Sequence, residues 1–187
     1  MNAPLIGLAG AARSGKDAAA RFLVDECGWQ RKAFADKVKD FLYTLNPWID
    51  AVETAEGAPL VDEVDRHGWE EAKEESEVVR RLLQRCGTEA GRGILGDHVW
   101  VDALFRDFES WGPTVVSDVR FPNEADAIRE RGGLVVRIER PGQRPITAAG
   151  HSSENALGGY LYDDVILNDG SLHQLRDRVM QLIPLAM

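Results

Sequence analysis

The sequence has few of the features that mark secreted, membrane-bound or nucleic-acid-coating proteins. It holds two cysteines, Cys27 and Cys86, whose spacing fits neither a disulfide framework nor a zinc site. Its formal net charge is −9, so it lacks the surplus of positive charge that a general nucleic-acid or membrane-surface binder needs. No apolar run approaches a membrane span, and the N-terminus does not resemble a signal peptide. We therefore expect a cytoplasmic protein with reduced thiols and with no nucleic-acid polymer or membrane as a partner.

What the sequence does contain is an ordinary globular balance. It is 44% hydrophobic and 28% charged, and its 187 residues fit one domain with one substantial core. Short apolar runs alternate with helical patterns and there is no internal repeat, which predicts an α/β fold with a parallel sheet covered by helices.

The hydrophobic pattern places the individual elements. The predicted strands cover residues 4–9, 31–35, 113–117, 134–138 and 165–167. The predicted helices cover residues 16–26, a segment around 38–42, and residues 69–85, 98–109, 123–131 and 171–183. Residues 46–68 contain several proline and glycine residues, which predict a broken, surface-lying segment, and Gly87 is a plausible helix stop. Residues 140–160 are rich in proline, glycine, serine and arginine and are predicted to form a mobile loop or lid.

The strongest motif follows the first predicted strand and precedes the first predicted helix. It reads Gly10-Ala11-Ala12-Arg13-Ser14-Gly15-Lys16-Asp17 and matches G-x4-G-K. Its glycines let backbone N–H groups turn inward toward a phosphate, and the following helix adds the partial positive charge of its N-terminus. The alternative is an ordinary glycine turn with a solvated lysine. We expect ATP to contact Gly10, Arg13, Ser14, Gly15, Lys16, Asp17 and Ala18.

The residue after Lys16 departs from the usual motif. A serine or threonine normally stands there and ligates Mg2+ through its hydroxyl group. Here the residue is Asp17, whose carboxylate is also a hard oxygen ligand that could hold the ion directly or through water. The alternative is that Asp17 only caps the helix or binds a nearby base.

A second phosphate site is indicated by Arg80-Arg81-x-x-Gln84, which closes with Gly87-Thr88-Glu89. Arg81 and Gln84 lie three apart on one helix face, where arginine would grip phosphate oxygens and glutamine would read a base edge. The alternative is a solvated helix face paired to Glu74 and Glu77.

Asp118-Val119-Arg120 follows a buried strand, and the carboxyl ends of strands in an open parallel sheet face the ligand crevice. Asp118 would orient the Mg2+ shell or the attacking phosphate, and Arg120 would neutralise the transferring charge. The alternative is a structural salt bridge between the two residues.

Further arginines lie in or beside the predicted lid, at Arg137, Arg140 and Arg144, before His151-Ser152-Ser153-Glu154. A supplied arginine contributes about 10^3 or more to the rate of phosphoryl transfer, and a closing lid keeps water from taking the phosphoryl group. His151 is interpreted as a surface or hinge histidine.

These residues together resemble the phage-type deoxynucleoside monophosphate kinases over nearly the whole chain. The matching segments are Ser14-Gly15-Lys16-Asp17, Phe34-Ala35-Asp36-Lys37-Val38-Lys39, Arg80-Arg81-Leu82-Leu83-Gln84, Gly87-Thr88-Glu89, Ser117-Asp118-Val119-Arg120-Phe121-Pro122-Asn123-Glu124, Arg140-Pro141-Gly142, His151-x-Ser153-Glu154 and Asn168-Asp169-Gly170-Ser171. The aspartate after the loop lysine is itself a trait of that family.

The resemblance implies a P-loop nucleotide kinase three-layer sandwich with a five-stranded parallel sheet in the order 2-3-1-4-5. It implies one kinase domain over residues 1–187, with a core of residues 1–45 and 112–187, a helical acceptor-binding insertion of residues 46–111 and a lid of residues 140–160. The implied reaction uses ATP and Mg2+ to convert a deoxynucleoside monophosphate (dNMP) to its diphosphate, in a homodimeric enzyme.

The resemblance also implies roles for individual residues. Catalysis is expected of Lys16, Arg81, Asp118 and Arg120. The acceptor would be bound by Lys39, Arg80, Arg81, Gln84, Thr88, Asp118, Arg120, Glu124 and Glu154. The donor would also contact Arg140, Asn168 and Gly170, because the loop after the last strand lies near adenine in related kinases.

Two other readings remain open. Phosphomevalonate kinases have a similar Ser-Gly-Lys-Asp loop and Ser-Asp-x-Arg strand end, although their match is shorter. A P-loop ATPase switch without a small acceptor would need no second phosphate site, and the arginines outside the loop weigh against it.

Overall fold

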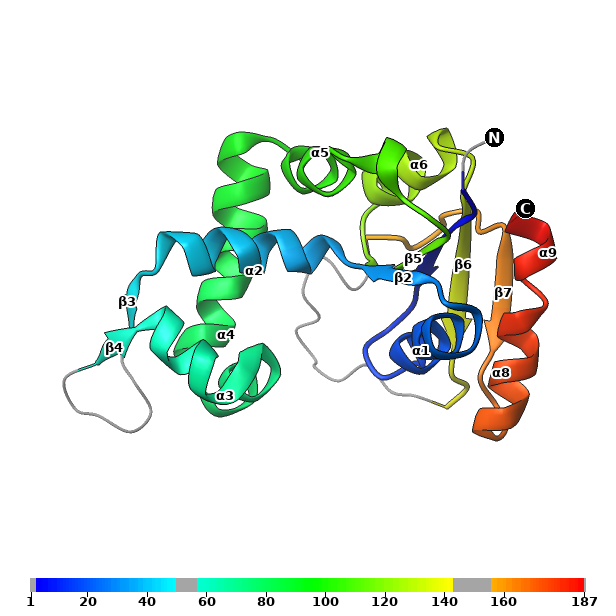
Figure 1. The fold of residues 1–187 in the computed structure, drawn as a ribbon, viewed down its shortest axis with the longest axis horizontal. Helices are drawn as coiled ribbons and strands as arrows, with labels where there is room; N and C mark the ends of the chain where they lie inside the picture. Colours follow the sequence, from blue (N-terminus) through cyan, green and yellow to red (C-terminus); the bar gives the residue numbers. More distant parts are fainter. Residues whose placement is uncertain (1–2, 50–56, 143–155, 187) are drawn as a thin grey trace. The chain divides into compact units, whose positions relative to one another are not determined.

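The structure is a computed structural model that describes residues 3–49, 57–142 and 156–186. The chain forms two compact units, one made of Met1–Phe34 with Phe105–Met187 and the other of Ala35–Leu104. We call them the sheet unit and the helical unit and describe each by itself (Figure 1).

The sheet unit is built on five parallel strands. These are β1 (Leu5–Ala9), β2 (Gln30–Lys32), β5 (Thr114–Val119), β6 (Leu134–Glu139) and β7 (Asp164–Leu167). Their order across the sheet is β2-β5-β1-β6-β7. Numbered among themselves in chain order, the five strands read 2-3-1-4-5, so the predicted fold class and sheet are confirmed. The labels differ only because a separate two-stranded pair, β3 (Trp48–Ile49) and β4 (Ala58–Pro59), takes two of the numbers.

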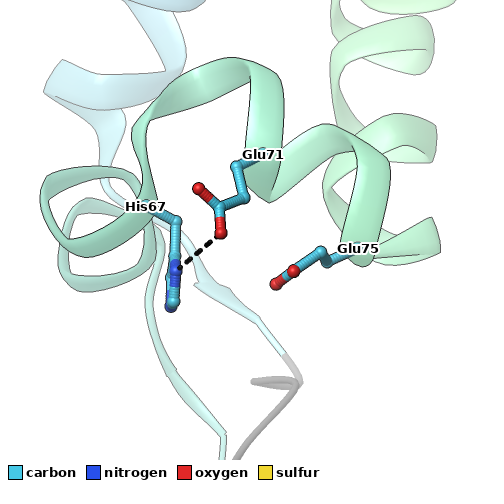
Figure 2. Close-up of side chains that lie close together, drawn as sticks. All are labelled: His67, Glu71 and Glu75. Atoms are coloured by element: carbon cyan, nitrogen blue, oxygen red, sulfur yellow. Dashed lines mark ion pairs between the residues drawn. The ribbon is translucent and has the colours of Figure 1, made fainter.

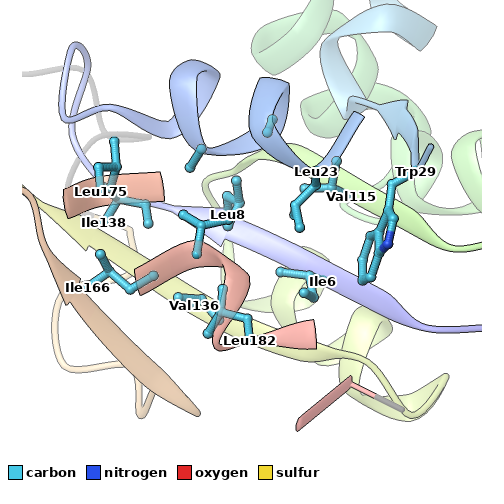
Figure 3. Close-up of a cluster of buried hydrophobic side chains, with 13 residues drawn as sticks. Ile6, Leu8, Leu23, Trp29, Val115, Val136, Ile138, Ile166, Leu175 and Leu182 are labelled. Atoms are coloured by element: carbon cyan, nitrogen blue, oxygen red, sulfur yellow. The ribbon is translucent and has the colours of Figure 1, made fainter. Parts of the chain in front are cut away.

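Helices cover both faces of this sheet. On one face, α1 (Lys16–Cys27) and α8 (Leu172–Met180) pack on alternate strand residues such as Ile6, Leu8 and Val136 (Figure 3). On the other face lies α6 (Pro122–Glu130), whose Ile128 approaches β1 so closely that a Cβ at Gly7 would meet its Cδ1 at 2.4 Å. Alternate side chains of β1 therefore pack against helices on opposite faces of the sheet, and the sheet with its two helical layers forms the three-layer sandwich. The sheet unit also contains η2 (Phe108–Ser110) and α9 (Ile183–Ala186).

The helical unit has its own core. Its helices are α2 (Phe34–Leu45, all but its first residue), α3 (Leu60–Glu75), α4 (Glu77–Gln84), the π-helix η1 (Arg85–Leu95) and most of α5 (Val99–Phe105). Their buried side chains form one apolar cluster of Val38, Leu42, Ile49, Leu60, Val64, Ala72, Val79, Cys86 and Trp100.

Most strand and helix predictions in the sheet unit are confirmed with small differences at the ends. The second strand was predicted to reach residue 35, but β2 ends at Lys32 because α2 begins at Phe34. The helix predicted over residues 98–109 is shorter, since α5 ends at Phe105.

The predictions for residues 46–87 were wrong in three respects. Residues 60–67 are helical rather than broken, with an interruption only at Gly68, and Leu60 is fully buried at the start of α3. The predicted helix over residues 69–85 is divided at Ser76, whose hydroxyl accepts from the N–H of Val79 and caps α4. Gly87 does not stop the helix, because the chain continues as the π-helix η1 and the carbonyl of Gly87 accepts from Nε1 of Trp100 at 2.8 Å.

Candidate functional site

The loop between β1 and α1 has the backbone of a phosphate cradle. Gly10, Arg13 and Gly15 adopt φ angles of 141°, 61° and 112°. A Cβ at Gly10 would lie 2.4 Å from the carbonyl oxygen of Ile138, and one at Gly15 would lie 2.5 Å from Nδ2 of Asn168. The two glycines are therefore required by both conformation and space, and successive N–H groups in such a turn form a concave anion site.

Lys16 and Ser14 bring polar groups to this loop. The Lys16 Nζ donates to the carbonyl oxygens of Gly10 and Ala11 at 2.8 and 2.7 Å, so its ammonium group lies over the cradle. Ser14 is 1% exposed, and its Oγ has no hydrogen-bond partner among the described residues. A buried hydroxyl without a partner beside backbone N–H groups and the N-terminus of α1 suits an anionic ligand.

A surface hollow opens beside the loop within the sheet unit. It is lined by Gly10, Ala11, Ala12, Lys16, Val119, Arg120, Arg137, Leu157, Gly158 and Tyr162. Three cationic residues thus line one hollow, at the start of α1, directly after β5 and in β6. Phosphate groups are the ligands for which such a combination is suited.

The end of β5 is reshaped where it approaches the hollow. Gly7 pairs with Val116 and Ala9 pairs with Val119, so β5 carries one more residue than β1 between the two pairs. The extra residue falls at Ser117-Asp118, and such a bulge changes the direction of the side chains around it.

Two carboxylates near the bulge hold the backbone that carries Arg120. Asp118 Oδ1 accepts from the N–H of Phe34 at 2.8 Å. Glu124 is 4% exposed, and its Oε2 accepts from the N–H groups of Arg120 and Phe121 at 2.8 and 3.1 Å. In this structure both carboxylates have backbone partners, and Glu124 is a cap for α6.

The residues predicted to contact the donor are distributed unevenly around the loop. Asn168 lies against it, because its Nδ2 donates to the carbonyl oxygen of Ser14 at 2.8 Å. Asp17 is exposed in the first turn of α1. Arg140 and Gly170 are exposed, and Gly170 precedes Ser171, the N-cap of α8.

The two arginines predicted to bind the acceptor phosphate through the helical unit contact neighbours there. Arg80 donates to Glu77 at 2.7 Å and to the carbonyl oxygen of Lys73 at 3.0 Å. Arg81 lies 3.7 Å from Glu77, and its side chain is 67% exposed. The predicted pairing of this helix face with Glu77 is thus present, whereas Glu74 contributes its carbonyl oxygen. Gln84 and Thr88 are exposed.

Lys39 in α2 contacts a residue that sequence reasoning missed. Its Nζ lies 3.0 Å from Oε1 of Glu70, which also binds Lys73. These hydrogen bonds, that of Lys73 above all, lower the pKa of Glu70 to about 2. Glu70 is 31 positions from Lys39, so no local pattern connects the two residues.

Other residues of the hollow were also missed. Leu157, Gly158 and Tyr162 carry no motif, and they reach the hollow only through the return of the chain toward β7. Arg144, His151 and Glu154, and most of the predicted lid, lie outside the described residues.

A separate cluster in α3 combines one imidazole with two carboxylates. Ligand atoms of His67, Glu71 and Glu75 all lie within 4.8 Å of one another, and His67 Nδ1 is 3.8 Å from Glu71 (Figure 2). Gly68, at φ 76° and ψ 161°, kinks the helix between them. Both glutamates are exposed, and exposed acidic groups are common without an ion, so we assign this cluster no role.

None of the described helices is long and apolar enough to cross a membrane.

Comparison with known proteins gives the family. Residues 61–179 match the family model of deoxynucleotide monophosphate kinases. A protein of Acanthamoeba polyphaga mimivirus assigned to these kinases is 30% identical over 96% of this chain and 95% of its own. The deoxynucleotide monophosphate kinase of Enterobacteria phage T4 is 33% identical over 54% of this chain and 43% of its own. Shikimate kinase from Aquifex aeolicus has the same fold, with a TM-score of 0.50 at 14% identity over 96% of each chain. The chain belongs to the deoxynucleotide monophosphate kinase family.

Proposed function

We propose that the protein transfers the γ-phosphoryl group of ATP to the phosphate of a deoxynucleoside monophosphate and releases ADP and the diphosphate. The observation that carries this proposal is the meeting of Lys16, Arg120 and Arg137 on one hollow beside the phosphate loop. Phosphoryl transfer needs positioning and neutralisation of charge more than covalent help, and this arrangement supplies both.

The donor is assigned to the sheet unit. The backbone N–H groups of the loop and the N-terminus of α1 would hold the ATP phosphates, and Lys16 would exchange the carbonyls of Gly10 and Ala11 for phosphate oxygens. Asn168 would keep the loop in shape through its bond to Ser14, with the adenine beside the segment from Asn168 to Gly170. Arg140 would bind ATP at the start of the lid.

The residues present fit Mg2+ at one position. Asp17 offers an exposed carboxylate in the first turn of α1, directly after the loop lysine, and carboxylate oxygen is a hard ligand of the kind Mg2+ takes. When bound, the ion would neutralise phosphate charge, and Asp17 would hold it directly or through water.

Acceptor roles are proposed for residues of each unit, taken by itself. Arg120 would neutralise the transferred group, and Asp118 would orient the attacking phosphate. The monophosphate would be bound by Lys39 and, within the acceptor-binding insertion of residues 46–111, by Arg80, Arg81, Gln84 and Thr88. We propose that Glu124 supports Arg120 through the backbone, since its carboxylate already accepts from that N–H group.

Two further properties are proposed, the oligomeric state and the location in the cell. The protein is proposed to form a homodimer, which light scattering of the purified chain would check. A cytoplasmic location follows from the proposed substrates, ATP and a monophosphate, which are both metabolites of that compartment.

The test is a panel of acceptors. With ATP and Mg2+, ADP release should require a dNMP and should differ among the bases and between ribose and deoxyribose. Turnover of phosphomevalonate without turnover of any dNMP would overturn the proposal in favour of a related small-molecule kinase. ATP hydrolysis at one rate with every acceptor would favour a P-loop switch.

The metal role has its own test. Asp17→Asn should raise the Mg2+ concentration needed for half-maximal turnover, because one oxygen ligand is weakened. Asp25→Asn, at an exposed position in the same helix, is the matched control and should leave the Mg2+ curve unchanged. An unchanged curve for Asp17→Asn would remove this residue from the metal shell.

A further inference from the structure

Arg137 enters the hollow from the opposite side of the loop to Arg120. β1 is the central strand, with β5 on one side and β6 on the other. Arg137 of β6 pairs with Ala9, the last residue of β1 before the loop. The two neighbouring strands therefore each bring one arginine to the lining of the hollow that the loop borders.

The Arg137 side chain is held by two neighbours. Its Nε lies 2.7 Å from Oε1 of Glu139, and the two side chains are 39% and 40% exposed. Its guanidinium carbon lies 5.4 Å from the centre of the Tyr162 ring. An exposed ion pair of this kind contributes little to stability, so its exchange for a stronger bidentate contact is easy.

Tyr162 is itself fixed in place. Its hydroxyl donates to the carbonyl oxygen of Leu157 at 3.2 Å, and its ring packs edge-on to Tyr160 at 5.6 Å. The ring therefore offers Arg137 a surface with a defined position at the wall of the hollow.

We infer that Arg137 is a second phosphate-binding arginine, which exchanges Glu139 for the phosphates held by the loop, and that Tyr162 is its positioning residue. The inference rests on the proposed function for its role in transfer, although binding of the phosphates alone does not require an acceptor. During transfer the bond from the γ-phosphorus to the bridging oxygen of ADP breaks and a bond to the acceptor oxygen forms. Arg137 would neutralise negative charge on the non-bridging oxygens from the side opposite Arg120.

The first experiment measures binding of inorganic tripolyphosphate to the whole chain by calorimetry, without acceptor. Arg137→Ala should weaken binding about 30-fold, the size expected for a lost charge-assisted pair of hydrogen bonds. Arg137→Lys should recover part of the loss. The matched control is Arg176→Ala, which breaks another glutamate pair in the same unit, with Arg176 37% exposed, and should bind as the wild type does. Equal binding by Arg137→Ala and wild type would overturn the inference.

Glu139 provides a test of opposite sign. Glu139→Gln should strengthen tripolyphosphate binding about threefold, because the ion pair no longer competes. In the double variant with Arg137→Ala this gain should disappear, since Glu139 then has no arginine to release. A gain of the same size with and without Arg137 would mean that Glu139 only repels the phosphates, and it would contradict the proposed exchange of Glu139 for phosphate by Arg137. Thermal unfolding of each variant separates these effects from loss of fold.

Tyr162 is tested by keeping or removing its ring. Tyr162→Phe should keep binding within about twofold, whereas Tyr162→Leu should weaken it about fivefold, because only the second change removes the surface under the guanidinium. Equal effects of the two changes would contradict the positioning role.

Turnover separates this inference from the proposed function. With ATP and a dNMP, Arg137→Ala should lower kcat about 100-fold. If the wild type bound tripolyphosphate through Arg137 but phosphorylated no dNMP, the proposed function would fail and the site would stand. If the wild type turned over dNMP and Arg137→Ala matched it in binding and kcat, the inference about Arg137 would fail and the proposed function would stand.

Discussion

The charged residues of the sheet unit and of the helical unit are held in different ways. Around the hollow, two supporting contacts go to the backbone, since Glu124 fixes the N–H of Arg120 and Asn168 fixes the carbonyl of Ser14. Arg137, by contrast, pairs there with an acid, Glu139. In the helical unit the cations themselves are bound by acids, Arg81 by Glu77 and Lys39 by Glu70. Under the proposed function, the loop and Arg120 of the sheet unit would be preorganised for phosphate, whereas Arg137 and the cations of the helical unit would have to exchange partners to bind one.

This difference follows from the two kinds of scaffold. Strand register sets where the carboxyl ends of β1, β5 and β6 lie, so their residues meet at the same edge. A helix face presents its charges to water, where ion pairs between neighbours contribute about 0–1 kcal/mol. Exchange of such a pair for a substrate phosphate costs little, so both modes are compatible with binding. The comparison predicts that changes in the sheet unit affect the rate and that changes in the helical unit affect acceptor affinity.

The largest effect is expected at Lys16. Lys16→Met should lower kcat about 1,000-fold, because the ammonium group over the cradle is lost where transition-state charge develops. Steady-state turnover measures the effect, and an unchanged thermal midpoint shows that the fold is intact. Turnover within about threefold of wild type would contradict the role of the loop.

The next effect sharpens the claim that the loop is preorganised. Gly15→Ala forces a Cβ against Asn168 at φ 112° and should lower kcat/KM for ATP about 100-fold. Gly28→Ala is the matched control, since Gly28 has φ 69° but nothing within 4 Å of its added Cβ. It should cost about 1 kcal/mol of stability and no activity. A similar loss of activity in both variants would mean that backbone strain at a positive φ angle explains the result, and not the contact between the added Cβ and Asn168.

A pair of arginine changes compares the two units directly. Arg120→Ala should lower kcat about 100-fold with little change in the KM for ATP, because its interaction develops in the transition state. Arg81→Ala should mainly raise the KM for the dNMP, by about tenfold. Initial-rate kinetics over both substrates separates the two outcomes, and a pure KM effect at Arg120 would break the comparison.

The sequence predicts more of the sheet unit than of the helical unit. The strands and the loop are predicted correctly, because short apolar runs and G-x4-G-K are local signals, whereas the order of the sheet was implied by the family resemblance. The division at Ser76 and the continuation past Gly87 are missed, because capping and π-helical geometry depend on tertiary packing against residues such as Trp100. The bond from Asn168 to Ser14 joins residues 154 positions apart, and no single-sequence pattern encodes it.

The smallest effect concerns the pH dependence of the helical unit. Because the pKa of Glu70 is lowered from 4.5 to about 2, its pairing stabilises the fold above pH 4.5, and this contribution disappears as the pH falls toward 2. Glu70→Gln should therefore lower stability by less than about 1 kcal/mol at pH 7, since the pair is exposed, and by nothing near pH 2. Urea unfolding at a series of pH values measures this, with Glu74→Gln on the same helix as control. A stability difference between wild type and Glu70→Gln that grew as the pH fell would contradict the prediction.

The extra residue in β5 has a consequence for insertions and deletions. Side chains in a regular strand alternate between faces, so β5 needs the bulge to bring Val119 opposite Ala9 with two residues between Val116 and Val119. Deletion of one residue at Ser117-Asp118 would keep Val119 opposite Ala9 but remove the bulge that redirects the neighbouring side chains, whereas a further insertion would shift Val119 and Arg120 out of this register. The length of this short stretch should therefore be under tighter constraint than the identity of most residues in it.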